Sequence, residues 1–282
     1  MRAAMTHSVS ITVLAENRSL RKDLTAEHGL SLWIEADGLR ILFDTGQGRA
    51  FLSNAERLGI DPAGADAIVL SHGHYDHSGG LTFLPELPAR SAIHLHPAAV
   101  LPRYSQGKRP PHKPIGMPAA SAAFIARVSQ RLRWSLSPAP ISDCIGLTGP
   151  IPRKTTCEDT GGPFFLDPEC LQPDTIPDDQ ALWVRTQNGL VVVLGCAHAG
   201  VVNTLDYLAS LLRTTHFRAV VGGMHLLRAD DERLDKTARA LKRYGVQILA
   251  PCHCTGDAAM IRLGECFTDG FVHLAAGSTL EL

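Results

Sequence analysis

The sequence predicts an α/β fold (α+β in some classification schemes) in which helices cover sheets, and three observations support this. Short β-branched runs such as "AIVL" and "GLVVVLG" are typical of buried strands. In the last third of the chain, such runs alternate with segments whose apolar residues have helical spacing. The 282 residues, 45% of them hydrophobic, are enough for one large domain over 1–282.

The first third of the chain alternates between predicted strands and turns. The segments 8–17, 65–70 and 92–96 have the apolar pattern of strands. The segments 30–36 and 40–45 flank "DGL", which indicates a hairpin. Residues 48–59 have helical spacing, with an apolar face formed by Phe51, Leu52, Ala55 and Leu58.

The last third is predicted to be regular. Its strands are expected at 189–195, 217–223, 246–250 and 270–277, and its helices at 200–213, 230–245 and 257–267. The helix at 230–245 has an acidic first turn, a basic last turn and Gly245 as its stop.

The middle of the chain, residues 97–180, has a different character. Prolines cluster in "KRPPHKPIGMP", "SPAPI" and "TGPIPRKT", and helical spacing is confined to 120–132. We interpret 97–180 as an insertion or lid within the single domain.

Composition excludes several classes of partner. The formal net charge of -1 gives no field that would attract nucleic acid or an anionic membrane. No apolar run approaches the roughly 18–20 residues that a membrane span needs. Residues 1–19 do not have the pattern of a signal peptide, and the 7 scattered cysteines favour a reducing compartment. We therefore expect a cytoplasmic protein.

The loop "SHGHYDHSGGL" at 71–81 follows a predicted buried strand and contains His72, His74, Asp76 and His77. His72 and His74 are two residues apart, so on an extended loop they face the same side. Asp76 and His77 follow a turn and can face a second ion. Neutral imidazole and carboxylate are ligands of Zn²⁺, Mn²⁺ or Fe²⁺, so this spacing predicts a metal site.

Three strands of the last third each deliver a histidine at their end. These residues are His198 in "GCAHAG", His225 in "VVGGMHL" and His253 in "PCHCTG". In an α/β sheet the loops at the carboxyl ends of parallel strands gather at one edge. We therefore expect the loop at 71–81 and these histidines to meet.

The other histidines are expected to be solvated or structural when each is considered alone. These are His28, His96, His112, His216 and His273, and His94 is expected to pack within a strand.

The loop at 71–81 matches the H-x-H-x-D-H signature of the metallo-β-lactamase fold superfamily, and the chain is identified as a member of it. "ILFDTG", "GCAHAG" and "APCHCTG" resemble its further motifs in order. "EHGLSLWIE", "TGPIPRKT", "DDQALWV" and "VVGGMHL" add a similarity to the branch that contains the archaeal dihydropterin-ribofuranosylaminobenzene-phosphate synthases. The resemblance covers nearly the whole chain.

The resemblance implies a four-layer αββα sandwich with a proline-rich insertion and a site at one edge. It implies one or two metal ions, held by His72, His74 and His198 and by Asp76, His77 and His253. Zinc is favoured because position 74 is histidine, whereas the flavodiiron branch has glutamate there; Mn²⁺ or Fe²⁺ remain alternatives. Asp44 would orient ligands, and further contacts to ligands or substrate are assigned to His28, Lys113 and Arg153.

One departure from the superfamily concerns the carboxylate that bridges the two ions in typical dinuclear members. The corresponding strand, 217–223, ends in Gly222-Gly223-Met224-His225 and offers no carboxylate. Asp206 and Asp230 fall within or at the start of predicted helices and do not replace it. His225 is therefore a candidate ligand, substrate contact, proton donor or orienting residue.

Our first functional hypothesis is a hydrolase acting on an ester, lactone or phosphoester of a small molecule. Metal ions would make hydroxide available, Asp76 would orient it, and His225 would assist the leaving group. Basic residues of the middle segment suggest a phosphorylated substrate; they are Lys108, Arg109, Lys113, Arg153 and Lys154.

Two alternatives remain open. A transferase would join a dihydropterin to a phosphoribosyl-aminobenzene with loss of diphosphate. A non-enzymatic metal or redox sensor would use Cys252 or Cys254, which flank His253, as thiolate ligands. The sequence is compatible with a homo-oligomer in each case.

Overall fold

The computed structural model describes residues 4–84 and 86–282, and its first large sheet has seven strands. In spatial order these are β16 (Thr279–Glu281), β1 (Val9–Ala15), β2 (Ser31–Ala36), β3 (Leu39–Phe43), β4 (Ala67–Val69), β5 (Ala92–Leu95) and β8 (Leu132–Trp134). The hairpin of β1 to β3 is antiparallel, whereas β3, β4, β5 and β8 run parallel. Their carboxyl ends therefore share one edge.

The second large sheet has six strands. In spatial order these are β15 (Ile248–Cys252), β14 (Phe217–Gly223), β13 (Gly189–Leu194), β12 (Leu182–Thr186), β10 (Ile145–Leu147) and β9 (Ala139–Pro140). The pairs β13–β14 and β14–β15 are parallel, so the ends of these three strands also meet at one edge.

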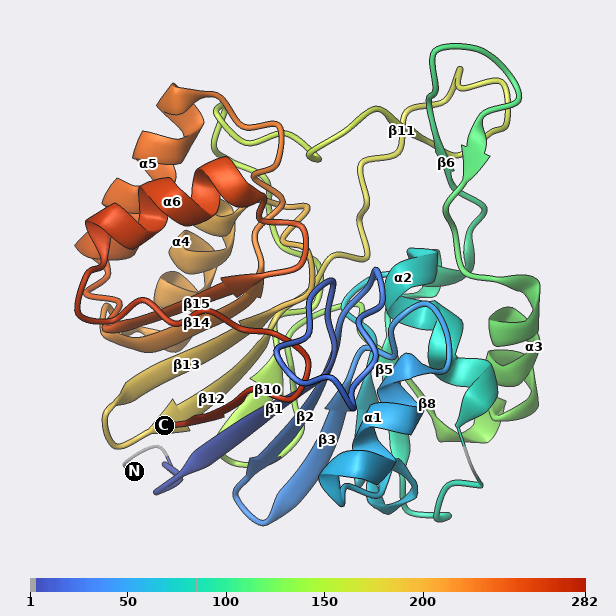
Figure 1. Cartoon of the computed structure of the whole chain (residues 1–282), viewed down its shortest axis with the longest axis horizontal. Helices are drawn as coiled ribbons and strands as arrows, with labels where there is room; N and C mark the ends of the chain where they lie inside the picture. The colour runs from blue at the N-terminus through green and yellow to red at the C-terminus, as the bar shows by residue number, and fades with distance from the viewer. Residues whose placement is uncertain (1–3, 85) are drawn as a thin grey trace.

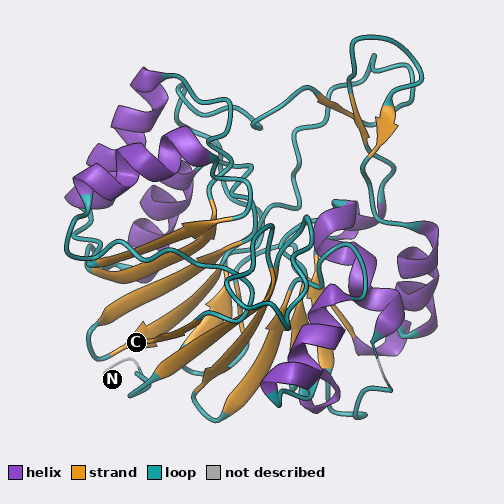
Figure 2. Ribbon diagram, in the orientation of Figure 1, coloured by secondary structure: helices purple, strands orange, loops and turns teal. Residues whose placement is uncertain are grey.

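Helices cover the outer faces of both sheets (Figure 2). On one side of the sandwich lie α1 (Ala50–Leu58), α2 (Tyr75–Ser78) and α3 (Ala119–Arg127), and on the other α4 (Val201–Leu212), α5 (Asp231–Arg243) and α6 (Asp257–Cys266) (Figure 1). Short 3-10 helices occur at Pro62–Gly64, Gly79–Phe83, Pro97–Val100 and Ser129–Arg131.

Strand alternation separates the apolar residues into three cores. In β13, Val191 and Val193 face the core between the two sheets, whereas Leu190, Val192 and Leu194 face the core beneath α4–α6. Successive side chains of a strand point to opposite faces, so a sheet buried on both sides reads as a continuous apolar run. A third core lies between the first sheet and its helices. The predicted α/β fold and four-layer αββα sandwich are confirmed.

The segment 97–180 divides into two kinds of structure. Its strands β8, β9 and β10 extend the edges of the two large sheets. By contrast, β6 (Tyr104–Ser105), β7 (Lys113–Pro114) and β11 (Phe164–Phe165) form a small separate sheet that projects from the sandwich (Figure 1). An insertion over the whole of 97–180 is therefore too broad as a structural description, since residues 132–147 belong to the sandwich.

One predicted strand was wrong. Residues 270–277 make only two isolated bridges, from Phe271 to Leu249 of β15 and from Ala276 to Ser19, and the closing strand β16 lies later, paired with β1. The segment crosses from the second sheet to the first. It therefore cannot form continuous strand hydrogen bonds with either sheet. The strand β12 was not anticipated, although its sequence "LWVRT" has strand-forming residues.

The helices in the described part of the chain are short or amphipathic, and none has the length and apolarity that a membrane crossing requires.

Candidate metal centre

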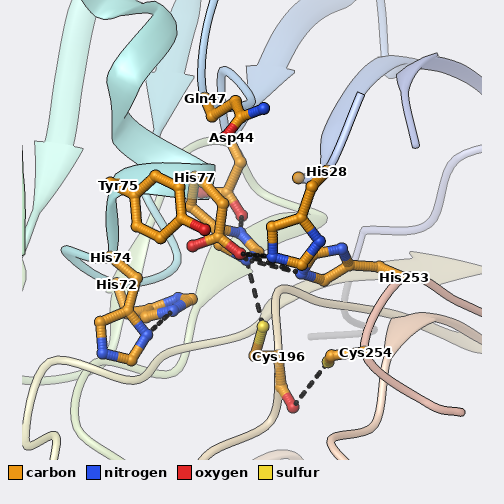
Figure 3. Close-up of polar contacts among 12 residues, drawn as sticks. His28, Asp44, Gln47, His72, His74, Tyr75, His77, Cys196, His253 and Cys254 are labelled. Carbon is orange, nitrogen blue, oxygen red and sulfur yellow. Dashed lines mark hydrogen bonds and ion pairs between the residues drawn. The ribbon is translucent and has the colours of Figure 1, made fainter. Parts of the chain in front are cut away.

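The predicted histidines meet where strands of both sheets end (Figure 3). Positive φ angles occur there at Asp44 after β3 (58°), Ala197 after β13 (54°), His225 after β14 (46°) and His253 after β15 (54°). Such backbone is costly for residues other than glycine and is concentrated at functional sites. Sharp turns at the strand ends thus aim the side chains at one point.

His72, His74 and His198 form the first group, which we call the three-histidine set. His72 Nε2 lies 2.9 Å from His74 Nδ1. The ring of His198 lies 4.7 Å from that of His72 and 4.9 Å from that of His74, between centroids. All three side chains are buried. The spacing of two residues in the loop does bring His72 and His74 to the same side.

Asp76, His77 and His253 form the second group, the carboxylate set. The Nε2 atoms of His77 and His253 are 3.2 Å apart, and they lie 4.0 and 3.5 Å from Asp76 Oδ2. His28 Nε2 approaches the same carboxylate oxygen to 3.2 Å, although the His28 side chain is 53% exposed. His28 therefore belongs to the site and is not an isolated surface histidine (Figure 3).

Asp44 determines the proton positions on two of the rings. Its carboxylate accepts from the Ser71 backbone N–H at 2.7 Å, from Ser71 Oγ at 2.7 Å and from His77 Nδ1 at 2.7 Å. Because the Ser71 hydroxyl hydrogen is committed to Asp44, Ser71 Oγ accepts from His72 Nδ1, 2.9 Å away. The lone pairs of His72 and His77 are therefore on Nε2, facing inward.

His198 and His253 are oriented in the same way by other segments. His198 Nδ1 donates to the Thr160 carbonyl at 2.7 Å, and His253 Nδ1 to Asn17 Oδ1 at 3.0 Å. Both Nε2 lone pairs then face inward. Holding the outer nitrogen of a metal-binding histidine by an acceptor fixes its ring and tautomer.

Burial keeps the three-histidine set neutral. It is the largest cause that lowers the pKa of His72, His74 and His198 well below the ordinary value, and neighbouring positive groups lower each further. A neutral imidazole is the form that binds a metal ion. The three-histidine set is thus in its ligand state near neutral pH.

The carboxylate set is tuned differently. Burial alone would raise the pKa of Asp76, but hydrogen bonds from His253 and His28 outweigh it and hold the pKa well below the ordinary value. Burial lowers the pKa of His77, but the charge and hydrogen bond of Asp44 outweigh it and raise the pKa. Asp76 is therefore an anion, and Asp44 increases the basicity of His77.

The side chains fit divalent metal ions. His74 Nε2 and His198 Nε2 are buried nitrogens without a hydrogen-bond partner in the described structure, and a buried polar atom of that kind is costly. Inward lone pairs of several neutral histidines beside one carboxylate are the donor set of borderline divalent cations.

The loop at 71–81 needs its glycines, because other segments approach its backbone closely. A Cβ on Gly73 would lie 2.0 Å from the Ala99 carbonyl oxygen, and one on Gly80 would lie 2.0 Å from that of Thr45. The Gly73 N–H donates to Asp178 Oδ2 at 2.8 Å, and Asp178 pairs with the buried Arg103. The backbone between the first two histidines is thereby fixed.

The carboxylates considered as bridging groups lie elsewhere. Asp206 accepts from the Tyr244 hydroxyl at 2.5 Å, and Asp230 accepts from the Arg233 N–H at the start of α5 at 2.8 Å. The group that does lie beside the predicted ligands is a thiol. Cys196 Sγ is 3.1 Å from His77 Nε2 (Figure 3).

A segment around residues 158–165 covers the three-histidine set. The Phe164 ring lies 5.3 Å from His74 and 5.5 Å from His198, between centroids. The ring of His225 lies 4.4 Å from that of His198 and 6.0 Å from that of Phe164, between centroids, and a Cβ on Gly161 would meet it. His225 thus contacts both a predicted ligand and the covering segment.

The two basic candidates occupy different positions. Arg153 donates to the His198 carbonyl, so it supports the loop of a predicted ligand. Lys113 lies on the exposed strand β7, and its Nζ is 3.0 Å from the hydroxyl of Tyr75, the residue before Asp76.

A cavity of about 410 Å³ borders one member of the carboxylate set, His253. Its wall includes His253, Cys254, Asn17, Leu227 and Met260, so it combines polar and apolar side chains. Ligand sites commonly combine these two kinds of wall.

Sequence reasoning missed Asn17, Ser71, Thr160 and Cys196. The first three contact histidines through atoms that many loop residues possess, so no pattern distinguishes them. Cys196 had a usable signal, because it stands two residues before His198 at the same strand end.

A two-sheet αββα sandwich with histidines from H-x-H-x-D-H and from later strand ends defines the class of the protein. The chain belongs to the metallo-beta-lactamase superfamily, whose family model matches residues 24–153. Like the relatives that share this fold, it is an enzyme.

Among individual proteins, the chain is 31% identical to the 7,8-dihydropterin-6-methyl-4-(beta-D-ribofuranosyl)-aminobenzene-5'-phosphate synthase of Methanocaldococcus jannaschii, over 97% of each chain. It is 30% identical to an uncharacterised protein of the same organism, over 96% of this chain and 100% of that one. The solved structure of Tm1679, a metal-dependent hydrolase of the beta-lactamase superfamily, matches with a TM-score of 0.80 and 32% identity, covering 97% and 99% of the two chains.

Proposed function

We propose that this enzyme is a metal-dependent hydrolase acting on an ester, lactone or phosphoester of a small molecule. The observation that carries the proposal is the set of inward-facing histidine nitrogens whose outer nitrogens are held by Asp44, Ser71, Thr160 and Asn17. Such preorganised ligands, beside an ionised carboxylate, are suited to Lewis-acid hydrolysis. The similarity to Tm1679 supports the same reaction class.

His72, His74 and His198 would hold one ion, and Asp76, His77 and His253 a second. Zinc is the ion we propose, because the donors are mainly imidazole nitrogens. When bound, the ions would lower the pKa of water and polarise an oxygen of the substrate.

The protein's own groups have separate tasks in this proposal. Asp76, as an anion, would orient the attacking water or hydroxide, and His28, 3.2 Å away, keeps its carboxylate positioned. His225, half-buried beside His198, contacts the substrate or donates a proton to the leaving group. Phe164 limits access of bulk water to the three-histidine set.

A transferase is the second candidate, and the observation that favours it is the 31% identity to the pterin synthase over 97% of the chain. In that case a dihydropterin would lose diphosphate and join a ribofuranosyl-aminobenzene phosphate. The cavity of about 410 Å³ beside the carboxylate set would receive one of the two substrates. The relatives are enzymes, which favours an enzyme over the non-enzymatic sensor.

The test begins with metal analysis of the purified protein, followed by zinc loading and two assays. One assay offers aryl phosphodiesters, aryl esters and lactones in turn; the other offers a dihydropterin diphosphate with and without the aminobenzene riboside phosphate. Turnover that needs no second substrate and incorporates oxygen from labelled water supports the hydrolase. Product formation only with both pterin and aminobenzene substrates rejects the hydrolase in favour of the transferase.

A further inference from the structure

The centre contains thiols that neither the sequence reasoning nor the proposed reaction uses. Cys196 follows β13, is buried, and places Sγ 3.1 Å from His77 Nε2. Its sulfur and one nitrogen each of His72 and His77 all lie within 4.8 Å of one another. Cys196 therefore faces one histidine from each of the two ligand sets.

A second group extends from the same sulfur. Cys196, His225 and Cys254 also offer ligand atoms within 4.8 Å of one another. The His225 N–H donates to Cys254 Sγ at 3.3 Å, and Cys254 Sγ is 3.8 Å from the Cys196 carbonyl oxygen (Figure 3). Cys254 is thus bound to backbone groups on both sides, whereas Cys196 Sγ faces the ligands.

The end of β14 explains why sulfur and not a carboxylate occupies this region. A Cβ on Gly223 would lie 2.4 Å from the Gly195 carbonyl oxygen and 2.7 Å from Cys254 Sγ. Real Cβ atoms do not approach other atoms so closely, so residue 223 cannot carry an aspartate here. The space where a bridging carboxylate would begin is filled by backbone and by Cys254.

We propose that Cys196 is a metal ligand, and that its thiolate takes the place between the two ion positions that a carboxylate takes in typical dinuclear relatives. The proposal rests on the metal dependence proposed above and specifies the ligand set of that site. Thiolate sulfur binds Zn²⁺ and Co²⁺ strongly, and a thiolate can bridge two such ions.

The charge balance of this proposal is simple. A thiol with its ordinary pKa of about 8.5 carries its proton before a metal ion binds. On coordination the S–H bond breaks, an S–metal bond forms, and the proton passes to solvent, with no oxidant or reductant required.

Cys252 is excluded from this role by its packing. Although it adjoins His253 in sequence, its side chain belongs to the apolar core between the two sheets. The sequence suggested two cysteines as thiolate ligands. The prediction for Cys252 is therefore wrong, whereas Cys254 Sγ contacts the His225 N–H and the Cys196 carbonyl oxygen. Cys252 serves as a matched control.

The experiment loads the full-length protein with Co²⁺ and records the near-ultraviolet absorption that a cobalt–sulfur bond produces. We expect the band in the wild type, its loss in Cys196→Ser, and its retention in Cys252→Ala and Cys254→Ser. Metal per chain is measured on each sample, and circular dichroism checks the fold. X-ray absorption at the zinc edge of the wild type tests for a sulfur neighbour without any substitution.

The outcomes separate this inference from the proposed function. Bound cobalt without a sulfur band in the wild type, or a band that survives Cys196→Ser and disappears in Cys254→Ser, overturns the role of Cys196 only. A wild type that binds no divalent metal overturns the proposed function as well. If Cys196→Ser fails to fold, the zinc-edge measurement on the wild type decides.

Discussion

The two ligand sets differ in their surroundings. The three-histidine set is fully buried, is kept neutral by burial and lies beneath the Phe164 ring. The carboxylate set contains the anion Asp76 and contacts the half-exposed His28, and its member His253 borders a cavity of about 410 Å³. Under the proposed function, we therefore expect the first set to retain an ion more firmly and the second to meet the substrate.

The largest expected effect tests whether both sets are needed. His74→Ala and Asp76→Ala each remove one predicted ligand from a different set. Loss of an outer partner of a metal-binding histidine costs about 10–100-fold, so loss of a ligand should cost at least ~100-fold in turnover and lower the metal content. Elemental analysis and the hydrolase assays measure both quantities.

The comparison predicts a further distinction between these two variants. Asp76→Ala should retain an ion in the intact three-histidine set, and His74→Ala should release the ion of that set. Equal turnover of metal-loaded wild type and Asp76→Ala on aryl phosphodiesters would show that Asp76 has no part in the reaction. Circular dichroism is the control for folding.

Asp44→Asn should have the next largest effect, because Asp44 contacts His77 directly and His72 through Ser71. Neutralising the acceptor lowers the basicity of the ligands, so we expect metal affinity to fall about 10–100-fold. Competition with a chelating dye measures the affinity. Asp206→Asn, which changes an exposed carboxylate, should leave the affinity unchanged; an unaltered affinity in both variants would rule out the orienting role.

Phe164→Ala should sharpen the difference in access between the sets. Removing the ring exposes His74 and His198 to water, so we expect release of metal to a chelator to become roughly 10-fold faster. Phe165→Ala, on the same short strand, is the matched control. If both variants release metal at the wild-type rate, the segment around β11 does not limit access.

The smallest effect concerns a buried histidine away from the ligand sets. Burial, with a smaller contribution from the positive charge of Arg133, lowers the pKa of His94 from 6.5 to about 4. Between these values the unfolded chain binds a proton that the folded chain does not, so stability falls as pH decreases from 6.5. His94→Gln should remove the proton uptake on unfolding at this position. Between neutral pH and about pH 5, the free energy of unfolding of the variant should therefore fall by ~1–2 kcal/mol less than that of the wild type.

Urea unfolding of metal-free wild type and His94→Gln at several pH values measures this effect. If the free energy of unfolding has the same pH dependence in the two proteins, the predicted effect of His94 is contradicted.

Much of the fold could be predicted because most elements carry a single periodicity. The strand β13 is apolar throughout and α5 has both charged ends and a glycine stop, so local sequence determines each of them. The segment 270–277 has the composition of a strand, but it has to cross between the sheets. That requirement comes from tertiary structure and leaves no mark on periodicity.

The ligand histidines were predictable for a different reason: their chemistry is rare and they stand at strand ends. Roles that depend on distance between segments were not predictable. His28 resembled a surface histidine until the structure placed it 3.2 Å from Asp76. Cys196 and Cys252 are the same residue type, but Cys252 ends β15 with its side chain in the core between the sheets, whereas Cys196 lies in the turn after β13 with its sulfur beside His77.

Each ligand set draws from both sheets, with His198 and His253 arriving from the second sheet and the loop at 71–81 from the first. A cation bound to either set is therefore a cross-link between layers otherwise joined by apolar packing. Slippage of one layer by a single residue would displace a ligand by about 3.3 Å, more than a coordination bond can follow. Metal release would then report the alignment of the two layers as well as the chemistry of the site.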